Sequence, residues 1–270
     1  MNAGFVVIAV QRSDYRSTSA SEQRAIPMET PVAIETNGIA YAVMMATPCD
    51  LEDFVTGFLL SEGLASADEV GDVALHPVEQ GEGFVARVNL PAHRLAPILE
   101  RARRRLGDSS CGICGIESIS AALRPLPPLQ ASSRAHPAAI RNALIAMKSG
   151  QRLGALTAAT HAAAFFGEDG TLLALREDVG RHNALDKLIG ALARRDMDPS
   201  QGFMVVTSRC SYEMVEKTVR AGCPLLIAIS APTDLAVRRA RQAGLALAVV
   251  ARDDSMQWVT VEETEAADGL

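Results

Sequence analysis

The sequence has no apolar run long enough to cross a membrane as a helix. Such a helix needs about 20 consecutive apolar residues, and no stretch of the 270 residues approaches that length. The short apolar segment from Phe5 to Val10 follows no basic region and precedes no clear small-residue cleavage site, so it does not predict a secretion signal. We therefore expect a cytoplasmic protein without a membrane partner.

The chain also has fewer basic than acidic residues. The chain has 26 Lys and Arg residues against 32 Asp and Glu residues, which gives a net charge of −6. This balance argues against a general nucleic-acid binder, because such proteins need basic surfaces to neutralise phosphates. A local basic cluster at Arg101, Arg103, Arg104 and Arg105 could meet an acidic partner or a phosphate, but a solvated helix face is the simpler interpretation.

A disulfide framework is missing as well. The chain has five cysteines, an odd number, and without an export signal this predicts free thiols in a reducing cytoplasm. Cys49, Cys210 and Cys223 stand alone in the sequence, and an isolated cysteine near apolar residues is most often a small buried hydrophobic residue. That interpretation fits Cys223 best.

The length and one strong break in the sequence predict two domains. The segment 125–128 holds three prolines in four residues, which cannot continue a helix and favour an extended linker. The polar residues 11–26 and the acidic end have too few apolar positions to pack. The predicted organisation is a flexible tail over 1–26, a small N-terminal α+β domain over 27–108, a cysteine loop and proline-rich linker over 109–130, a C-terminal domain over 131–262 and an acidic tail over 263–270.

The N-terminal domain mixes strands and helices. Two β-prone runs flank Asn37-Gly38, a pair that supplies the positive φ angles of a hairpin turn. Asp50 can cap a helix that would end near Gly63. A further strand over 83–90 and a helix over 92–106 complete a compact α+β unit.

The C-terminal domain has a regular alternation of strands and helices. Three apolar runs of strand length, 203–206, 225–229 and 245–250, alternate with amphipathic helical segments over 211–221 and 234–243. Continuous apolar strands separated by helices are typical of a βαβαβ unit, so we predict an α/β domain with a parallel sheet.

Polar residues follow each of these three runs. Ligands of open parallel sheets bind where the strands end, because the following helix N-termini present free N–H groups and a positive dipole to anions. Ser211 and Thr233 could equally serve only as helix caps, so the pattern alone leaves a ligand crevice and simple capping both open. The candidates are Arg209, Ser211, Ser230, Thr233, Arg252, Asp253, Asp254 and Ser255.

A second polar cluster occupies residues 176–183, ahead of a segment with helical periodicity. Arg181 and His182 could hold phosphate or pterin oxygens or act as proton donors, while Asp178 could cap the helix. A structural salt-bridge network explains this density of charge equally well. His161 lies among apolar residues, where a core histidine is the favoured interpretation.

Cys111 and Cys114 form the clearest chemical motif, a Cys-x-x-Cys pair between glycines and serines. Structural zinc needs a second ligand pair, which the sequence lacks, so we predict no metal site. A thioredoxin-type pair should follow a strand and open a helix, whereas this pair comes after a predicted helix. A sulfur-carrying or nucleophilic thiol on a flexible loop fits best, because loop exposure makes the sulfur accessible to another protein.

Several blocks of the sequence together resemble one known family. Their likeness spans roughly residues 28 to 261, and the block 177–187 is the most specific. The sequence resembles the FdhD family of sulfur carriers that formate dehydrogenase requires. The blocks are Cys111–Gly115, Thr160–Ala164, Glu177–Lys187, Ser208–Met214 and Ser230–Thr233.

The resemblance implies a function and a fold. Members of the family act as cytoplasmic sulfurtransferases: they accept sulfur from a cysteine desulfurase as a persulfide and pass it to the molybdenum bis(molybdopterin guanine dinucleotide) cofactor before its insertion into formate dehydrogenase. A guanine nucleotide such as GDP could mimic that cofactor. The resemblance also implies a homodimer and a cytidine-deaminase-like, three-layer α/β/α C-terminal domain. Deaminase chemistry is not implied, because the zinc signature of the deaminases is absent.

The resemblance also assigns individual residues. Cys111 corresponds to the persulfide-bearing cysteine and Cys114 to its companion. Arg181 and His182 are cofactor-binding candidates from their place near a helix start and not from the resemblance. The cofactor-contacting segment falls on Val250, Ala251, Arg252, Asp253, Asp254 and Ser255.

This chain departs from the family pattern at two places. Asp254 and Ser255 replace a usual glycine and basic residue, and adjacent carboxylates would repel phosphate unless Arg252 or the helix N-termini compensate. Cys210 stands where a small residue such as alanine is expected.

Three functional interpretations remain open from the sequence. In the leading one, Cys111 carries the sulfur, and Cys114 either expels it as sulfide by forming a disulfide or only positions the loop. A cofactor chaperone would need the crevice and not the thiols. A disulfide or redox enzyme would turn over dithiol substrates without the cofactor.

Overall fold

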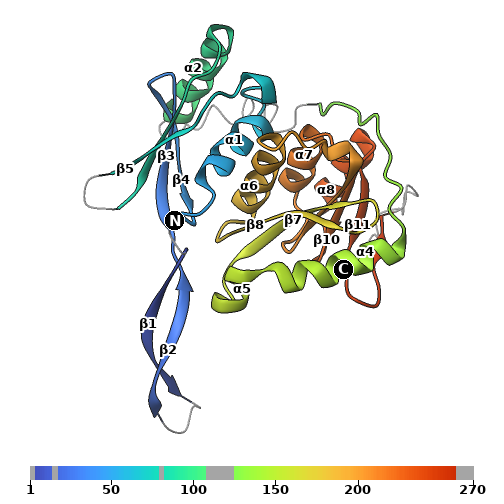
Figure 1. The fold of residues 1–270 in the computed structure, drawn as a ribbon. Coiled ribbons are helices and arrows are strands. Elements are labelled where there is room, and N and C mark those ends of the chain that lie inside the picture. Colours follow the sequence, from blue (N-terminus) through green and yellow to red (C-terminus); the bar gives the residue numbers. More distant parts are fainter. Residues whose placement is uncertain (1–3, 14–17, 79–81, 108–124, 260–270) are drawn as a thin grey trace, which may run out of the picture.

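The computed structural model describes residues 4–13, 18–78, 82–107 and 125–259. Figure 1 shows three parts: a two-stranded arm, an N-terminal sheet with its helices, and a C-terminal sheet between helices. Residues 125–136 carry no helix or strand, as the proline-rich segment predicts. The acidic tail predicted over 263–270 lies outside the described residues.

The N-terminal part is a four-stranded sheet in the order β4-β3-β6-β5. Asn37 and Gly38 have φ angles of 51° and 76° in the turn between β3 and β4, which confirms the predicted hairpin. Helix α1 (Leu51–Ser61) buries Phe54 and Phe58 in the core of this part, and helix α2 (Ala92–Gly107) also packs there. The strands are β3 (Thr30–Thr36), β4 (Ile39–Ala46), β5 (Ala74–Pro77) and β6 (Phe84–Val88). A short 3-10 helix, η1, covers Ala67–Glu69.

Helix α1 begins where the sequence predicts it, although not by the predicted device. Asp50 stands at the N-cap, but its φ is 52° and its side chain makes no capping hydrogen bond. Gly63 follows the end of the helix with a φ of 65°, a left-handed conformation that favours glycine. The expected side-chain cap is therefore wrong, and the expected stop is confirmed.

The C-terminal part is a six-stranded sheet in the order β12-β11-β10-β9-β7-β8. The three strands β9 (Gly202–Val206), β10 (Leu225–Ala228) and β11 (Ala246–Val249) are parallel and buried, which confirms the predicted βαβαβ unit. Alternate residues of β9 point into different cores: Met204 faces one core and Phe203 the other. The other strands are β7 (His161–Gly167), β8 (Leu172–Asp178) and β12 (Gln257–Trp258).

Helices cover both faces of this sheet, which gives the three-layer α/β/α arrangement expected for the C-terminal domain. One core is built from the strands and helices α6 (Arg181–Ala193), α7 (Tyr212–Arg220) and α8 (Asp234–Ala243). The opposite core contains α4 (Pro137–Gly150). Short helices α5 (Arg152–Thr157) and η2 (Pro199–Gln201) complete the elements. Among the described helices, none is long and apolar enough to cross a membrane.

The segment predicted as a flexible tail over 1–26 is organised in the structure, so that expectation is wrong for its described residues. Strands β1 (Phe5–Ser13) and β2 (Thr18–Pro27) pair antiparallel from Phe5 opposite Pro27 to Ser13 opposite Thr18. Figure 1 shows this arm projecting from the rest of the chain. These residues have too few apolar positions to pack against a core, and the arm is held instead by its own ladder of backbone hydrogen bonds.

The two main parts meet where α1 crosses α6. The crossing is so close that a Cβ atom on Gly57 would lie 1.7 Å from the backbone oxygen of Asp186. A Cβ atom on Gly190 would lie 1.9 Å from the backbone oxygen of Asp53. The two helices therefore touch backbone to backbone, and only glycine fits at either position.

We expect Gly57→Ala to lower the free energy of unfolding by about 3 kcal/mol or more, because the added methyl group must separate α1 from α6. Urea denaturation of the purified chain measures this change. Gly71→Ala is the matched control, since its Cβ would lie 3.6 Å from the nearest atom, an ordinary contact. A Gly57→Ala variant as stable as Gly71→Ala would contradict the close crossing.

Candidate functional site

The sheet edge at which the sequence predicts a ligand, here called the ligand edge, is formed by more strands than the sequence indicated. Strands β9, β10 and β11 end there, and the antiparallel β7 begins there. Strand β8 also ends at this edge, because it pairs antiparallel with β7. The loops after β8, β9, β10 and β11 therefore lie along one side of the sheet, the side where open α/β sheets bind ligands.

Three helices start at this edge, and their N-caps are Gly180, Ser211 and Thr233. The Thr233 side chain accepts a hydrogen bond from the backbone N–H of Ala236 at 3.3 Å, which confirms the predicted cap. Ser211 makes no capping bond and donates its hydroxyl to the Glu213 carboxylate at 3.1 Å instead. The N-terminal N–H groups and dipoles of α6, α7 and α8 favour an anionic ligand.

The loops after β9 and β10 are tied together at Cys210. Its N–H donates to Ala231 at 3.1 Å, and its carbonyl accepts from the N–H of Thr233 at 3.0 Å. The Cys210 side chain is fully buried, and burial raises the pKa of its thiol to about 12. Cys210 therefore serves as a small core residue in the place where alanine was expected.

The segment after β11 has an unusual backbone and no free arginine. Val250 has a φ of 50°, a strained conformation for a β-branched residue. The guanidinium group of Arg252 donates to the carbonyls of Ile229 and of Ala251. Asp253 and Asp254 are exposed to solvent. The Arg252 guanidinium is therefore engaged with backbone carbonyls. Water screens the charges of the Asp253 and Asp254 carboxylates.

A cluster of basic and imidazole groups lies where α6 begins. The Nε2 atom of His182 lies 2.8 Å from a carboxylate oxygen of Glu213, the same oxygen that Ser211 contacts. His161 is partly buried at the start of β7, and burial followed by the charges of Arg181 and His182 lowers its pKa. The charge of Arg181 is therefore close enough to His161 to favour the neutral form of its imidazole.

Sequence reasoning undervalued His161, for which it favoured a place in the core. The structure puts this residue at the edge, opposite Asp178 in the β7–β8 ladder. The sequence did contain a signal for this position. His161 is the first residue of an apolar run, and the first residue of such a run lies at the terminus of a strand and not in its buried middle.

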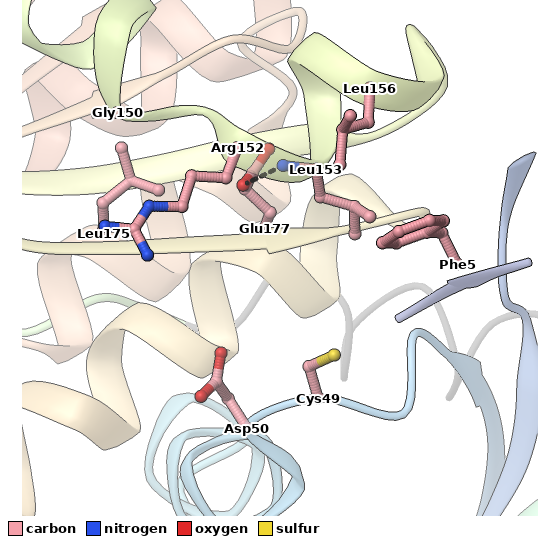
Figure 2. Close-up of a pocket in the computed structure, with 9 residues that line it drawn as sticks. All are labelled: Phe5, Cys49, Asp50, Gly150, Arg152, Leu153, Leu156, Leu175 and Glu177. Atoms are coloured by element: carbon pink, nitrogen blue, oxygen red, sulfur yellow. Dashed lines mark hydrogen bonds between the residues drawn. The ribbon is translucent and has the colours of Figure 1, made fainter. Parts of the chain in front are cut away.

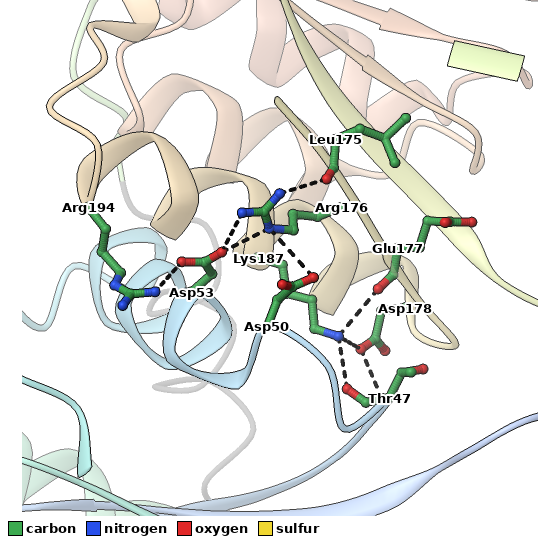
Figure 3. A network of polar contacts seen from close by, with 9 residues as sticks. All are labelled: Thr47, Asp50, Asp53, Leu175, Arg176, Glu177, Asp178, Lys187 and Arg194. Atoms are coloured by element: carbon green, nitrogen blue, oxygen red, sulfur yellow. Dashed lines mark hydrogen bonds and ion pairs between the residues drawn. The ribbon is translucent and has the colours of Figure 1, made fainter. Parts of the chain in front are cut away.

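Several residues of the block 177–187 contact the N-terminal part of the chain. The fully buried Lys187 ammonium lies 2.6 Å from the Asp178 carboxylate and donates to the Thr47 carbonyl at 2.9 Å, as Figure 3 shows. Asp178 also accepts from the N–H groups of Thr47 at 2.9 Å and Gly180 at 2.8 Å. The predicted helix cap by Asp178 is replaced by this bridge between the two parts.

Two further charge clusters surround the α1–α6 crossing. Asp53 accepts hydrogen bonds from Arg176 at 2.7 Å and from Arg194 at 2.5 Å (Figure 3). Asp186 accepts from Ser61 at 2.6 Å and from Lys217 at 2.8 Å. Of the two interpretations open for residues 176–183, the salt-bridge network holds for Arg176 and Asp178, and a place at the ligand edge holds for Arg181 and His182.

A separate cavity of about 530 Å³ lies beside Cys49, between the root of the arm, α5 and β8 (Figure 2). Burial raises the pKa of the Cys49 thiol, while the Lys187 ammonium partly offsets that effect. Burial also raises the pKa of Cys223 to about 12, and its side chain is fully buried, which confirms it as a core residue. Cys111 and Cys114 lie outside the described residues. In the part of the chain that is described, no His, Cys, Asp and Glu side chains gather as a set of metal ligands.

Comparisons with known proteins give a consistent result. A family model described as the FdhD/NarQ family matches residues 27–264. A protein of Xanthomonas euvesicatoria named sulfur carrier protein FdhD is 49% identical over 248 residues, which cover 92% of this chain and 88% of that protein. A protein of Variovorax paradoxus with the same name is 46% identical over 234 residues, 86% of this chain and 83% of that protein.

One solved structure is similar along nearly the whole chain. A protein from Desulfotalea psychrophila, described as a formate dehydrogenase accessory protein, matches with a TM-score of 0.75 and 23% identity. The match covers 96% of this chain and 98% of the other. At this identity the similarity supports the fold and carries no argument about activity.

We expect Lys187→Met to lower the free energy of unfolding by about 3–5 kcal/mol, because the buried Asp178 carboxylate loses its ammonium partner. Chemical denaturation monitored by circular dichroism checks this. Arg238→Met is the control: Arg238 pairs with Asp234 at 2.8 Å on the surface of α8, and its removal should change stability little. Equal effects of the two substitutions would show that Lys187 does not bridge the two parts.

We expect the His161 imidazole to have a lowered pKa in the folded chain, because burial and the charges of Arg181 and His182 disfavour its protonated form. We expect Arg181→Gln to raise this pKa without restoring 6.5, because burial, the larger cause, remains. Nuclear magnetic resonance of the imidazole protons measures both values, with Arg209→Gln as the control. Because the unfolded chain binds this proton more readily, the contribution of His161 to stability is lost as the pH falls below 6.5. A His161 pKa insensitive to Arg181→Gln would contradict their proximity.

Proposed function

The chain belongs to the FdhD/NarQ family, and on that premise we propose that it is a sulfurtransferase that matures formate dehydrogenase. It accepts sulfur from a cysteine desulfurase as a persulfide on Cys111 and delivers it to the molybdenum bis(molybdopterin guanine dinucleotide) cofactor. The recipient enzyme then receives the sulfurated cofactor. The observation that carries this proposal is the 49% identity, over 92% of the chain, to a relative named as a sulfur carrier.

The chemistry of the cysteines supports the choice of thiol. A persulfide carrier needs a thiolate, and burial raises the pKa of Cys49, Cys210 and Cys223. These three cysteines are therefore poor nucleophiles at neutral pH. Of the five cysteines, Cys111 and Cys114 remain as candidates for the reactive thiol.

Loading is a thiol exchange at sulfur. The Cys111 thiolate attacks the terminal sulfur of the donor persulfide, the sulfur–sulfur bond of the donor breaks, and the donor cysteine leaves as a thiolate. For release, the Cys114 thiolate attacks the inner sulfur of the Cys111 persulfide, and hydrosulfide leaves toward the cofactor. The resulting Cys111–Cys114 disulfide returns to two thiols at the expense of a cellular dithiol reductant.

The ligand edge of the C-terminal sheet fits an anionic cargo such as a guanine dinucleotide. Three helices begin at this edge, and Arg181, His182 and Arg209 lie in the loops or first helical turns there. We propose that Ser211, Ser230 and Thr233 add hydroxyl contacts and that residues 250–255 close the site. A guanine nucleotide such as GDP would occupy part of it.

The carboxylates of Asp253 and Asp254 do not prevent this contact. Both are exposed, so solvent screens their repulsion of phosphate. Compensation comes from the helix N-termini and Arg181 and not from Arg252, whose guanidinium donates to backbone carbonyls. We further propose that the protein works in the cytoplasm as a homodimer.

We expect Cys111→Ala to abolish the added mass of about 32 Da, one sulfur atom, after incubation with a cysteine desulfurase and cysteine. The same variant should fail to restore formate dehydrogenase activity in cells that lack the native protein. Mass spectrometry of the intact protein and an activity assay measure the two results. Cys49→Ala, which removes a thiol of raised pKa, should behave as the unmodified chain does.

The alternatives give different outcomes. If Cys111→Ala still carries and delivers sulfur, the assignment of the carrier is wrong. If maturation survives loss of both Cys111 and Cys114 while GDP binding is needed, the protein is a cofactor chaperone. Turnover of dithiol substrates without the cofactor would identify a redox enzyme. Accumulated persulfide in Cys114→Ala would assign release to Cys114.

A further inference from the structure

Glu213 holds two of the side chains that the ligand edge would offer to a ligand. Its Oε2 atom lies 2.8 Å from Nε2 of His182 and 3.1 Å from the hydroxyl oxygen of Ser211. An ionised carboxylate only accepts hydrogen bonds, so both partners donate to the same oxygen atom. Neither of these two donors is available to a ligand while the Glu213 side chain stays in place.

The contact joins the first turns of two helices. His182 is the second residue of α6, Glu213 is the second residue of α7, and Ser211 is the N-cap residue of α7. Ser211 makes no side-chain capping bond, whereas Thr233 at the same position of α8 accepts from the N–H of Ala236. The Glu213 carboxylate thus lies at the positive ends of two helices and takes two donors there, as a bound anion would.

Little folding stability depends on this contact. The side chains of His182 and Glu213 are 29% and 38% exposed, and ion pairs that reach solvent contribute little because water screens them. Lys217, one turn further along α7, is different, since its ammonium lies 2.8 Å from the buried Asp186 carboxylate. The Glu213 side chain can therefore turn into water without unpairing a buried charge.

We propose that Glu213 is an internal competitor for the phosphate groups of the ligand. Its carboxylate holds Ser211 and His182 in the free protein, and a phosphate oxygen displaces it and accepts both hydrogen bonds. The inference rests on the proposed function, because it takes the ligand edge as the binding site of a guanine dinucleotide cargo. It adds a specificity-determining residue to that site.

Competition by a carboxylate makes the site selective for strongly anionic groups. A phosphate oxygen replaces the carboxylate oxygen at the two helix N-termini without loss of negative charge there. A neutral hydroxyl or base edge would be a weaker acceptor than Glu213, because hydrogen bonds to an ionised group are about twice as strong as neutral ones. The phosphates of the ligand, and not its base, should therefore contact Ser211 and His182.

Isothermal titration calorimetry with GDP tests the proposal on the full-length chain. We expect Glu213→Gln to bind GDP about three- to tenfold more tightly than the unmodified chain, because an uncharged side chain competes less well for the two donors. Asp234→Asn is the matched control. It also removes one carboxylate from a first helical turn at this edge, but the Asp234 side chain is 76% exposed and pairs with Arg238. The affinity of this control for GDP should change less than about twofold.

A double substitution separates displacement from a general effect of charge. In a His182→Ala background the contact with Glu213 is already broken, so Glu213→Gln should improve GDP binding less than it does in the unmodified chain. Thermal unfolding followed by circular dichroism verifies that each variant is folded. Unchanged or weaker GDP binding by Glu213→Gln, or an equal gain from Asp234→Asn, would overturn the proposal.

Failure of the proposal and failure of the proposed function give different results. If GDP binds the unmodified chain and Glu213→Gln equally well, the ligand edge stands and Glu213 is no competitor. If GDP binds neither of them, the proposed ligand edge is wrong and this inference is wrong with it. Sulfur loading on Cys111 does not involve Glu213, so its absence would count only against the proposed function.

Discussion

The close crossing of α1 and α6 at Gly57 and Gly190 sets the relation between the two main parts of this protein. Backbone contact leaves no room for side chains, so the distance between the helices cannot adjust without breaking the contact. The charges of Asp53 and Asp186 flank the crossing and are each met by basic groups from the C-terminal part. Since these charges are buried, a shift of either helix would leave carboxylates without partners.

The same helix carries the candidate site, which links the crossing to function. Helix α6 begins with Arg181 and His182 at the ligand edge, and Lys187 lies less than two turns later in the bridge to Thr47. One short block thus holds side chains that face the ligand edge and side chains that hold the N-terminal part. The dense run of ionisable residues therefore serves both a salt-bridge network between the two parts and the candidate site. It can serve both because a helix presents different faces at successive positions.

The elements that the sequence predicts well are those whose pattern is local. The turn at Asn37 and Gly38 needs positive φ angles, and the buried strands β9 to β11 need continuous apolar runs, so both were predicted correctly. The placement of His161 at the sheet edge depends on the order of the strands. The bridge from Lys187 to Thr47 joins residues that are 140 positions apart in the sequence. The arm was missed because its strands pair with each other and not with a core.

The burial of thiols has a consequence for how a sulfur carrier can be specific. Thiol exchange occurs at any accessible thiolate, so a second reactive cysteine would divert the transferred sulfur. Cys210 and Cys223 have pKa values of about 12 because the core excludes water from them. Cys49 is only half-buried, yet its pKa is also raised, since desolvation outweighs the nearby Lys187 ammonium. Burial of these three thiols thereby suppresses transfer of sulfur to the wrong cysteine.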